Sequence, residues 1–98
     1  ENIMLLKLNI NSDGYNQLIT IKQDRKGGCF DFGLLDNNAQ IFTFNNLCTF
    51  EKLIDIWVML FCYGHCLIAI DTPLEQKIKQ ILANWVDRIK EYDLEVQA

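Results

Sequence analysis

One uncharged stretch near the middle of the chain limits the possible folds more than any other feature. Between Asp55 and Asp71 no side chain carries a charge at neutral pH, apart from His65 when it is protonated. A segment this apolar is stable only when it is buried, so the rest of the chain must pack around it. Gly64 interrupts the stretch, which is also shorter than the roughly twenty residues that a membrane-spanning helix needs. We therefore predict two buried elements and no insertion into a membrane.

The size and composition of the chain fit one folded domain that covers residues 1–98. Hydrophobic residues make up 50% of the sequence, too many for an intrinsically disordered chain. Thirteen acidic and nine basic residues give a formal net charge of −4. Binding to nucleic acid needs a cationic face that neutralises phosphates. We therefore expect no direct binding to nucleic acid and consider a basic protein a more suitable partner.

Four segments before the uncharged stretch alternate apolar and polar residues, which predicts β-strands with one face on the core. The predicted strands are residues 3–10, 15–23, 29–35 and 39–45. The turns between them are rich in Gly, Asn and Asp, which suit turn conformations. Strands joined by tight turns run antiparallel, so we expect a four-stranded meander. Its outward face would show Leu5, Leu18 and Ile41 among polar residues.

After these strands, the spacing of the apolar residues changes from every second residue to that of a helix. Apolar residues recur at helical spacing after Thr49, whose side chain is a predicted N-cap. Gly64 follows as a natural helix stop. The apolar run at residues 67–70 predicts a fifth strand, with a continued helix as the alternative.

A second helix starts with the clearest capping signal in the chain. Thr72 is the predicted N-cap, Pro73 the first helical residue, and Glu75 completes a Thr-x-x-Glu capping box. Apolar residues at helical spacing continue to Tyr92, with Trp85 as the expected core anchor, and a tail follows. The predicted class is therefore α+β. We expect a mostly antiparallel sheet, the order β-β-β-β-α-β-α, and helices packed on one face.

The cysteines allow more than one chemistry. The chain contains four of them, Cys29, Cys48, Cys62 and Cys66. All lie in apolar runs, where cysteine behaves as a small buried hydrophobe, so we favour reduced thiols and a cytoplasmic protein. An even count in a short chain also permits disulfides.

Cys62, His65 and Cys66 form the most suggestive cluster of reactive side chains. They could bind zinc, but their Cys-x-x-x-Cys spacing is not that of a paired zinc knuckle, so we expect neither a metal nor another cofactor. His65 is the only histidine, and no carboxylate is paired with a second one by spacing. We therefore expect no catalytic residues and no enzyme activity.

One end of the predicted meander collects acidic and amide side chains, because alternate turns of antiparallel strands fall at the same end. The residues predicted there to bind a partner are Asp13, Asp36, Asn37, Asn38, His65, Glu91, Asp93 and Glu95. At the opposite end, acidic and basic residues nearly cancel. An end whose charges are mainly negative would attract a basic partner and speed its association.

A small acidic α+β chain of this kind resembles the small immunity proteins of bacterial contact-dependent growth inhibition systems. The resemblance lies in its size, the lack of a reaction motif, and the carboxylates of Asp13, Asp36, Glu91, Asp93 and Glu95. Proteins of that family bind one cognate toxin domain, often a nuclease, and block its active site. The resemblance implies that these carboxylates enter the basic groove of a nuclease toxin. Two other functions stay open: an oligomerising adaptor or subunit, and a small Cys/His metal-binding protein.

Overall fold

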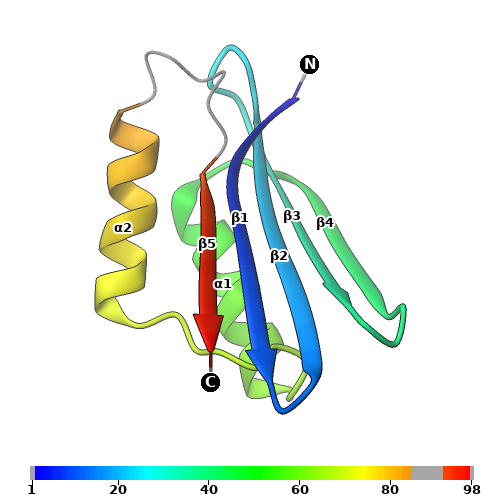
Figure 1. The fold of residues 1–98 in the computed structure, drawn as a ribbon. Coiled ribbons are helices and arrows are strands. Elements are labelled where there is room, and N and C mark those ends of the chain that lie inside the picture. The colour runs from blue at the N-terminus through cyan, green and yellow to red at the C-terminus, as the bar shows by residue number, and fades with distance from the viewer. Residues whose placement is uncertain (1, 85–91, 98) are drawn as a thin grey trace.

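Four strands, two helices and a fifth strand follow one another along the chain in the computed structural model, which describes residues 2–84 and 92–97 (Figure 1). The elements are β1 (Asn2–Ser12), β2 (Tyr15–Asp24), β3 (Phe30–Asp36), β4 (Ile41–Leu47), α1 (Phe50–Cys62), α2 (Thr72–Ala83) and β5 (Asp93–Gln97). The predicted α+β class is confirmed. The predicted order is wrong in its last two elements, because the second helix precedes the fifth strand.

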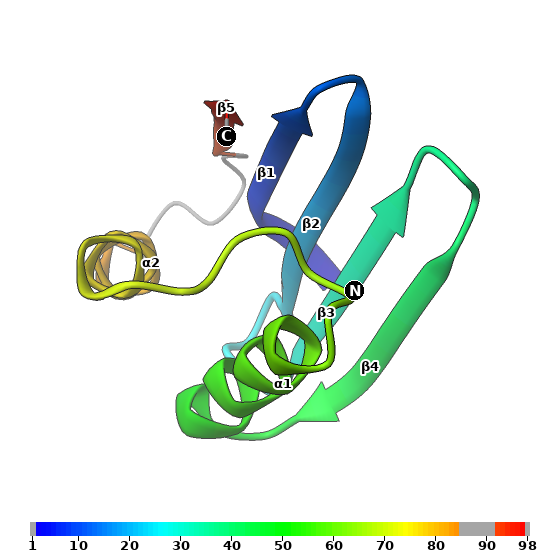
Figure 2. The same cartoon turned by 90° about the horizontal axis from the view of Figure 1, so that it is seen from below.

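The strands form one five-stranded sheet in the order β4-β3-β2-β1-β5. The first four strands pair antiparallel with their neighbours along the chain, which confirms the predicted meander. β5 lies beside β1 and runs parallel to it, from Lys7↔Asp93 to Asn11↔Gln97, so the sheet is mixed. Both helices lie on the same face, which we call the inner face, and the opposite one is the outer face (Figures 1 and 2).

Alternation along the strands places the side chains as predicted, except near the start of β1. Ile19 and Ile21 on β2 are fully buried on the inner face, and Leu8 on β1 is buried beside them. Leu5 was expected on the outward face, but only 3% of it is exposed. The pairing of β1 with β2 shifts register between Met4 and Leu6, and a β-bulge there turns two consecutive side chains inward.

The segment predicted as the fifth strand is instead part of an irregular crossover, residues 63–71, which joins α1 to α2. Ile68 and Ile70 still pack against the core from this crossover, which explains why the sequence there is apolar. A short apolar run predicts burial but does not identify the backbone conformation. The true fifth strand, Asp93–Gln97, lies in the segment expected to be a tail.

The two helix starts are fixed by side-chain caps. Thr49 caps α1 as predicted, and its hydroxyl accepts a hydrogen bond from the Lys52 amide at 3.1 Å. The N-cap of α2 is Asp71 and not Thr72, because the Asp71 carboxylate accepts from the Leu74 amide at 2.9 Å. The predicted extension of this helix beyond Ala83, with Trp85 as its anchor, falls on residues 85–91, outside the described part of the chain.

Among the described residues, Trp57 of α1 is the largest fully buried side chain. Its ring packs against Phe32 of β3, with centroids 5.9 Å apart. Its indole N–H donates a hydrogen bond to the Ile68 carbonyl at 3.0 Å. Trp57 therefore joins the sheet, the first helix and the crossover in one core.

We predict that Trp57→Ala lowers the free energy of unfolding by about 3–5 kcal/mol, because it leaves a large cavity and removes the indole hydrogen bond to the Ile68 carbonyl. Urea denaturation followed by far-UV circular dichroism measures this change. The control is Val58→Ala on the same helix, where the side chain is 43% exposed and the expected loss is about 0.5 kcal/mol or less. Equal losses for the two variants would contradict this assignment of the core.

Candidate partner-binding surface

Four segments meet at one end of the molecule, which we call the turn end: residues 12–15, 36–40, 63–71 and 95–97 (lower end in Figure 1). Hydrogen bonds join the first two of these turns. The Asn37 side-chain amide donates to the Gly14 carbonyl at 2.9 Å, and the Asn37 backbone amide donates to the Asn16 carbonyl at 3.1 Å. The structure thus brings together turns that the sequence prediction placed at one end.

Asp36 lies in this end but faces inward, and only 8% of it is exposed. Its carboxylate accepts hydrogen bonds from the Tyr15 hydroxyl at 2.6 Å and from the amides of Asn38 and Gln40 at 2.9 Å each. The bond from Tyr15 is the main cause that holds the pKa of Asp36 below its usual value, while burial opposes it. The same bond raises the pKa of Tyr15. Asp36 therefore holds its turn in place and contributes an internal negative charge.

Gln17 is a buried side chain in this region that the sequence prediction did not single out. It lies on the inner face of β2 with 3% of its surface exposed. Its amide nitrogen donates to the His65 carbonyl at 2.6 Å, and its amide oxygen accepts from the Leu67 amide at 2.8 Å. Gln17 thereby fixes the irregular crossover to the sheet. The available signal was a polar residue in phase with the inward positions Ile19 and Ile21.

His65 occupies the crossover at the turn end as predicted, but its imidazole packs against a ring of the core. The His65 and Phe42 ring centroids are 4.6 Å apart. The neighbouring Cys66 thiol is buried and donates to the Ile68 carbonyl at 3.3 Å. Burial is the main cause that raises the pKa of this thiol, so it stays protonated near neutral pH.

The other predicted site residues are divided between two places. Asp13 and Asn38 are exposed in the two turns, and Glu95 is exposed near the end of β5. Asp93 lies further from the turn end, where its carboxylate is 4.0 Å from the Lys7 ammonium. Glu91 lies outside the described residues.

The charged side chains of the turn end are acidic. The four segments that build it contain Asp13, Asp36, Asp71 and Glu95, and no Lys or Arg occurs within them. Asp71 joins the group because α2 begins at this end, which the predicted element order did not allow. Carboxylates gathered at one end of a molecule produce a field that attracts cations.

The outer face of the sheet adds an apolar feature beside the turn end. Five side chains lie in register across the sheet and form what we call the outer row: Glu95, Asn9, Leu18, Leu35 and Ile41. Leu35 is 40% exposed and Ile41 is 65% exposed. The next row, further from the turn end, consists of Asp93, Lys7, Thr20, Gly33 and Thr43. A shallow hollow of about 390 Å³ extends over both rows.

A second hollow, of about 690 Å³, opens on the other side of the molecule between α2 and β5. Leu74 of α2 and Leu94 of β5 face into it, with Lys77 and Glu95 also among the residues that line it. The described residues around it include no Ser, Cys or His, so they supply no hydroxyl or thiol nucleophile and no imidazole base. We assign no chemistry to this hollow.

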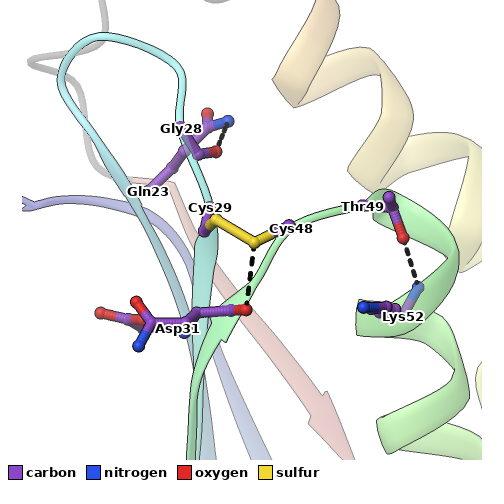
Figure 3. The surroundings of a disulfide bond; sticks show 8 residues. Gln23, Gly28, Cys29, Asp31, Cys48, Thr49 and Lys52 are labelled. Atoms are coloured by element: carbon purple, nitrogen blue, oxygen red, sulfur yellow. Dashed lines mark hydrogen bonds between the residues drawn. A yellow bond between two sulfur atoms is a disulfide. The ribbon is translucent and has the colours of Figure 1, made fainter.

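Cys29 and Cys48 form a disulfide, so the prediction that all four thiols are reduced is wrong. Figure 3 shows the bond between the residue before β3 and the segment that leads from β4 into α1. Their Cα atoms are 4.2 Å apart, because Phe30 pairs with Leu47 and the next residues outward face each other. The sequence held a signal for this bond, since the two cysteines lie about equally far from the turn at residues 36–40. Cys62 and Cys66 are free.

The described residues contain no group of three or more His, Cys, Asp or Glu side chains that could hold a metal ion. Cys29 and Cys48 are bonded to each other, so neither supplies a thiolate ligand for a metal. In the same part of the chain, neither helix has the length and apolar character needed to cross a membrane.

Comparison of the chain with known protein families, with curated proteins and with solved structures found no match. The function must therefore be inferred from the surface of this chain itself.

The lowered pKa of Asp36 predicts an acid-sensitive turn end. A carboxylate whose pKa is lower in the folded than in the unfolded state stabilises the fold above the unfolded pKa of about 3.9, and this contribution is lost as the pH falls through the folded pKa. We expect Asp36→Asn to be less stable at neutral pH and to lose less further stability than the wild type below about pH 4. Urea denaturation between about pH 2.5 and 7 measures both effects. The control Asp13→Asn removes an exposed carboxylate nearby, and a wild-type pH profile for Asp36→Asn would contradict the prediction.

The disulfide predicts a specific count of thiols. The denatured, unreduced protein should react with a thiol reagent at two cysteines, and at four after reduction. Because the bond closes a loop of sequence separation 19, the variant Cys29→Ser/Cys48→Ser should lose roughly 3 kcal/mol of unfolding free energy. Cys62→Ser, which removes an exposed free thiol, is the control and should lose far less. Four reactive thiols before reduction would disprove the bond.

Proposed function

We propose that this chain is a non-catalytic binding domain that captures a basic protein at its turn end, in the manner of an immunity protein that neutralises a nuclease toxin. The observation that carries the proposal is the charge of the turn end, where carboxylates gather without any Lys or Arg in the segments that form it. The groove of a nuclease is cationic because it binds phosphates. Carboxylates placed in that groove would occupy the positions of phosphates and exclude the substrate.

The rigidity of the turn end supports this function. Asn37 joins the two sheet turns, and Gln17 holds the crossover beside them. Exposed groups such as Asp13 and Glu95 are thus presented from ordered backbone. A surface that is ordered before binding loses less conformational entropy on association, which favours affinity.

The compartment in which binding takes place depends on the cysteines. The expected cytoplasmic location was based on reduced thiols, and disulfides are rare in the cytoplasm. The Cys29–Cys48 bond instead supports folding in an oxidising compartment. We include this location in the proposal in place of the cytoplasm.

An oligomerising subunit is the second candidate, because Leu35 and Ile41 expose apolar surface on the outer face. Size-exclusion chromatography with multi-angle light scattering distinguishes the two candidates. A monomer over the accessible concentration range favours the binding domain.

The proposed function is tested by affinity capture of partners from the native host and by kinetics with the captured partner. We expect a basic protein whose association slows as salt is raised. The double variant Asp13→Asn/Glu95→Gln should reduce the association rate constant by about threefold to tenfold at low ionic strength, with a smaller effect at high salt.

The matched control is Glu51→Gln/Asp55→Asn, which removes two exposed carboxylates from α1 and leaves the turn end unchanged. It should retain most of the wild-type rate. An acidic partner, or equal effects of the two double variants, would contradict the proposed function.

A further inference from the structure

The outer row lies on a part of the sheet that no described element covers. Both helices pack on the inner face of the five-stranded sheet (Figures 1 and 2). Side chains alternate between the two faces of a strand, so those on the outer face point away from the helices. In-register neighbours on adjacent strands have Cβ atoms roughly 4.5–5.5 Å apart. Leu18, Leu35 and Ile41 therefore form one continuous aliphatic strip across β2, β3 and β4.

We propose that this strip is the central contact for the basic partner, and that the bound segment of the partner is cationic at one end and aliphatic at the other. This inference rests on the proposed function, since it concerns the same partner. Interfaces typically place apolar anchors at the centre and charged groups at the rim. The outer row places a charged group at one end and apolar side chains from its middle to the other end, with Glu95 on β5 and Ile41 on β4.

The row of Asp93, Lys7, Thr20, Gly33 and Thr43 lies beside the strip, and part of this row lines a hollow. Gly33 lies between Thr20 and Thr43, and a Cβ at this position would be 2.7 Å from the Thr20 hydroxyl oxygen. The absence of a side chain at Gly33 therefore keeps the hollow of about 390 Å³ open next to Leu35. An aliphatic side chain of the partner can lie in this hollow and lose part of its contact with water, which is the main source of affinity in such contacts.

The charges beside the strip select a cationic partner over a second copy of this chain. Glu95 belongs to the strip's own row, and Asp13 lies in the adjoining turn. The outward cations lie further from the turn end: Lys7 is one row away, where Asp93 is 4.0 Å from it, and Lys22 lines the far part of the hollow beside Asp31. Two copies meeting through this face would place carboxylates of like charge in one interface, which is unfavourable.

Two short capped peptides serve as probes of the strip. The first is Arg-Arg-Gly-Leu-Val-Leu, and the second is Arg-Arg-Gly-Ser-Thr-Ser, which has the same charge without the aliphatic side chains. Titrations followed by two-dimensional amide NMR measure the dissociation constants and locate the shifted residues. We expect the aliphatic peptide to bind at least about tenfold more tightly, a difference of about 1.4 kcal/mol. We also expect it to shift the amides of Leu18, Leu35 and Ile41.

The variant Leu35→Gln/Ile41→Gln should remove this preference for the aliphatic peptide. The matched control is Val58→Gln, since Val58 is 43% exposed and Leu35 is 40% exposed, but Val58 lies on α1. The control should keep the preference within about twofold. Amide spectra of each variant establish that it is folded.

The remaining outcomes overturn the inference. Equal binding of the two peptides, no binding of either, or a preference that survives in Leu35→Gln/Ile41→Gln would exclude the strip as the central contact. These results leave the proposed function standing if host capture yields a basic partner sensitive to Asp13→Asn/Glu95→Gln. A wild-type dimer that Leu35→Gln/Ile41→Gln dissociates would assign the strip to a second copy of the chain and likewise overturn the inference.

Discussion

The two hydrogen bonds of Gln17 are the constraint on which the placement of the crossover, and of the elements after it, depends. The crossover between the helices has no regular secondary structure, and its backbone cannot satisfy its own polar groups as a helix does. Gln17 pairs with the His65 carbonyl and the Leu67 amide, and Trp57 pairs with the Ile68 carbonyl. With the crossover fixed, α2 begins at the turn end and β5 returns parallel to β1. Both helices then cover the inner face and leave the outer face open.

The same arrangement separates the polar groups of the turn end into two kinds. Those on the inner side, such as Asp36 and Tyr15, bond to each other and hold the turns. Those on the outside, such as Asp13 and Glu95, are exposed. Internal hydrogen bonds thus keep the charged surface in one conformation, and the proposed partner would meet a surface that needs little rearrangement. The register of the strands places the outer row next to the turn end, so the aliphatic strip adjoins this charged surface.

Local sequence signals predicted the parts of the fold that depend on local physics. The alternation of apolar and polar residues predicted the four-stranded meander, and Thr49 as a capping residue predicted the start of α1. Both predictions succeed because strand pleating and helix capping act over a few residues. The crossover, the parallel β5 and the Cys29–Cys48 bond depend on contacts between distant segments. An apolar run such as residues 67–70 predicts burial but not backbone conformation. The role of Gln17 cannot be predicted from sequence, because it depends on the distant crossover backbone that its side chain contacts. The acidic turn end was predictable because it follows from strand direction, whereas the outer row required the exact pairing.

The exchange rate of the Leu67 amide hydrogen, measured by NMR in the wild type and in Gln17→Leu, tests the role of the crossover constraint most directly. The side-chain oxygen of Gln17 accepts a hydrogen bond from this amide. If Gln17 holds the crossover, the Leu67 amide is strongly protected in the wild type. In Gln17→Leu it should then exchange at least about a hundredfold faster, while the amides of Ile19 and Ile21 keep most of their protection. An unchanged rate at Leu67, in a variant that remains folded, would contradict the account.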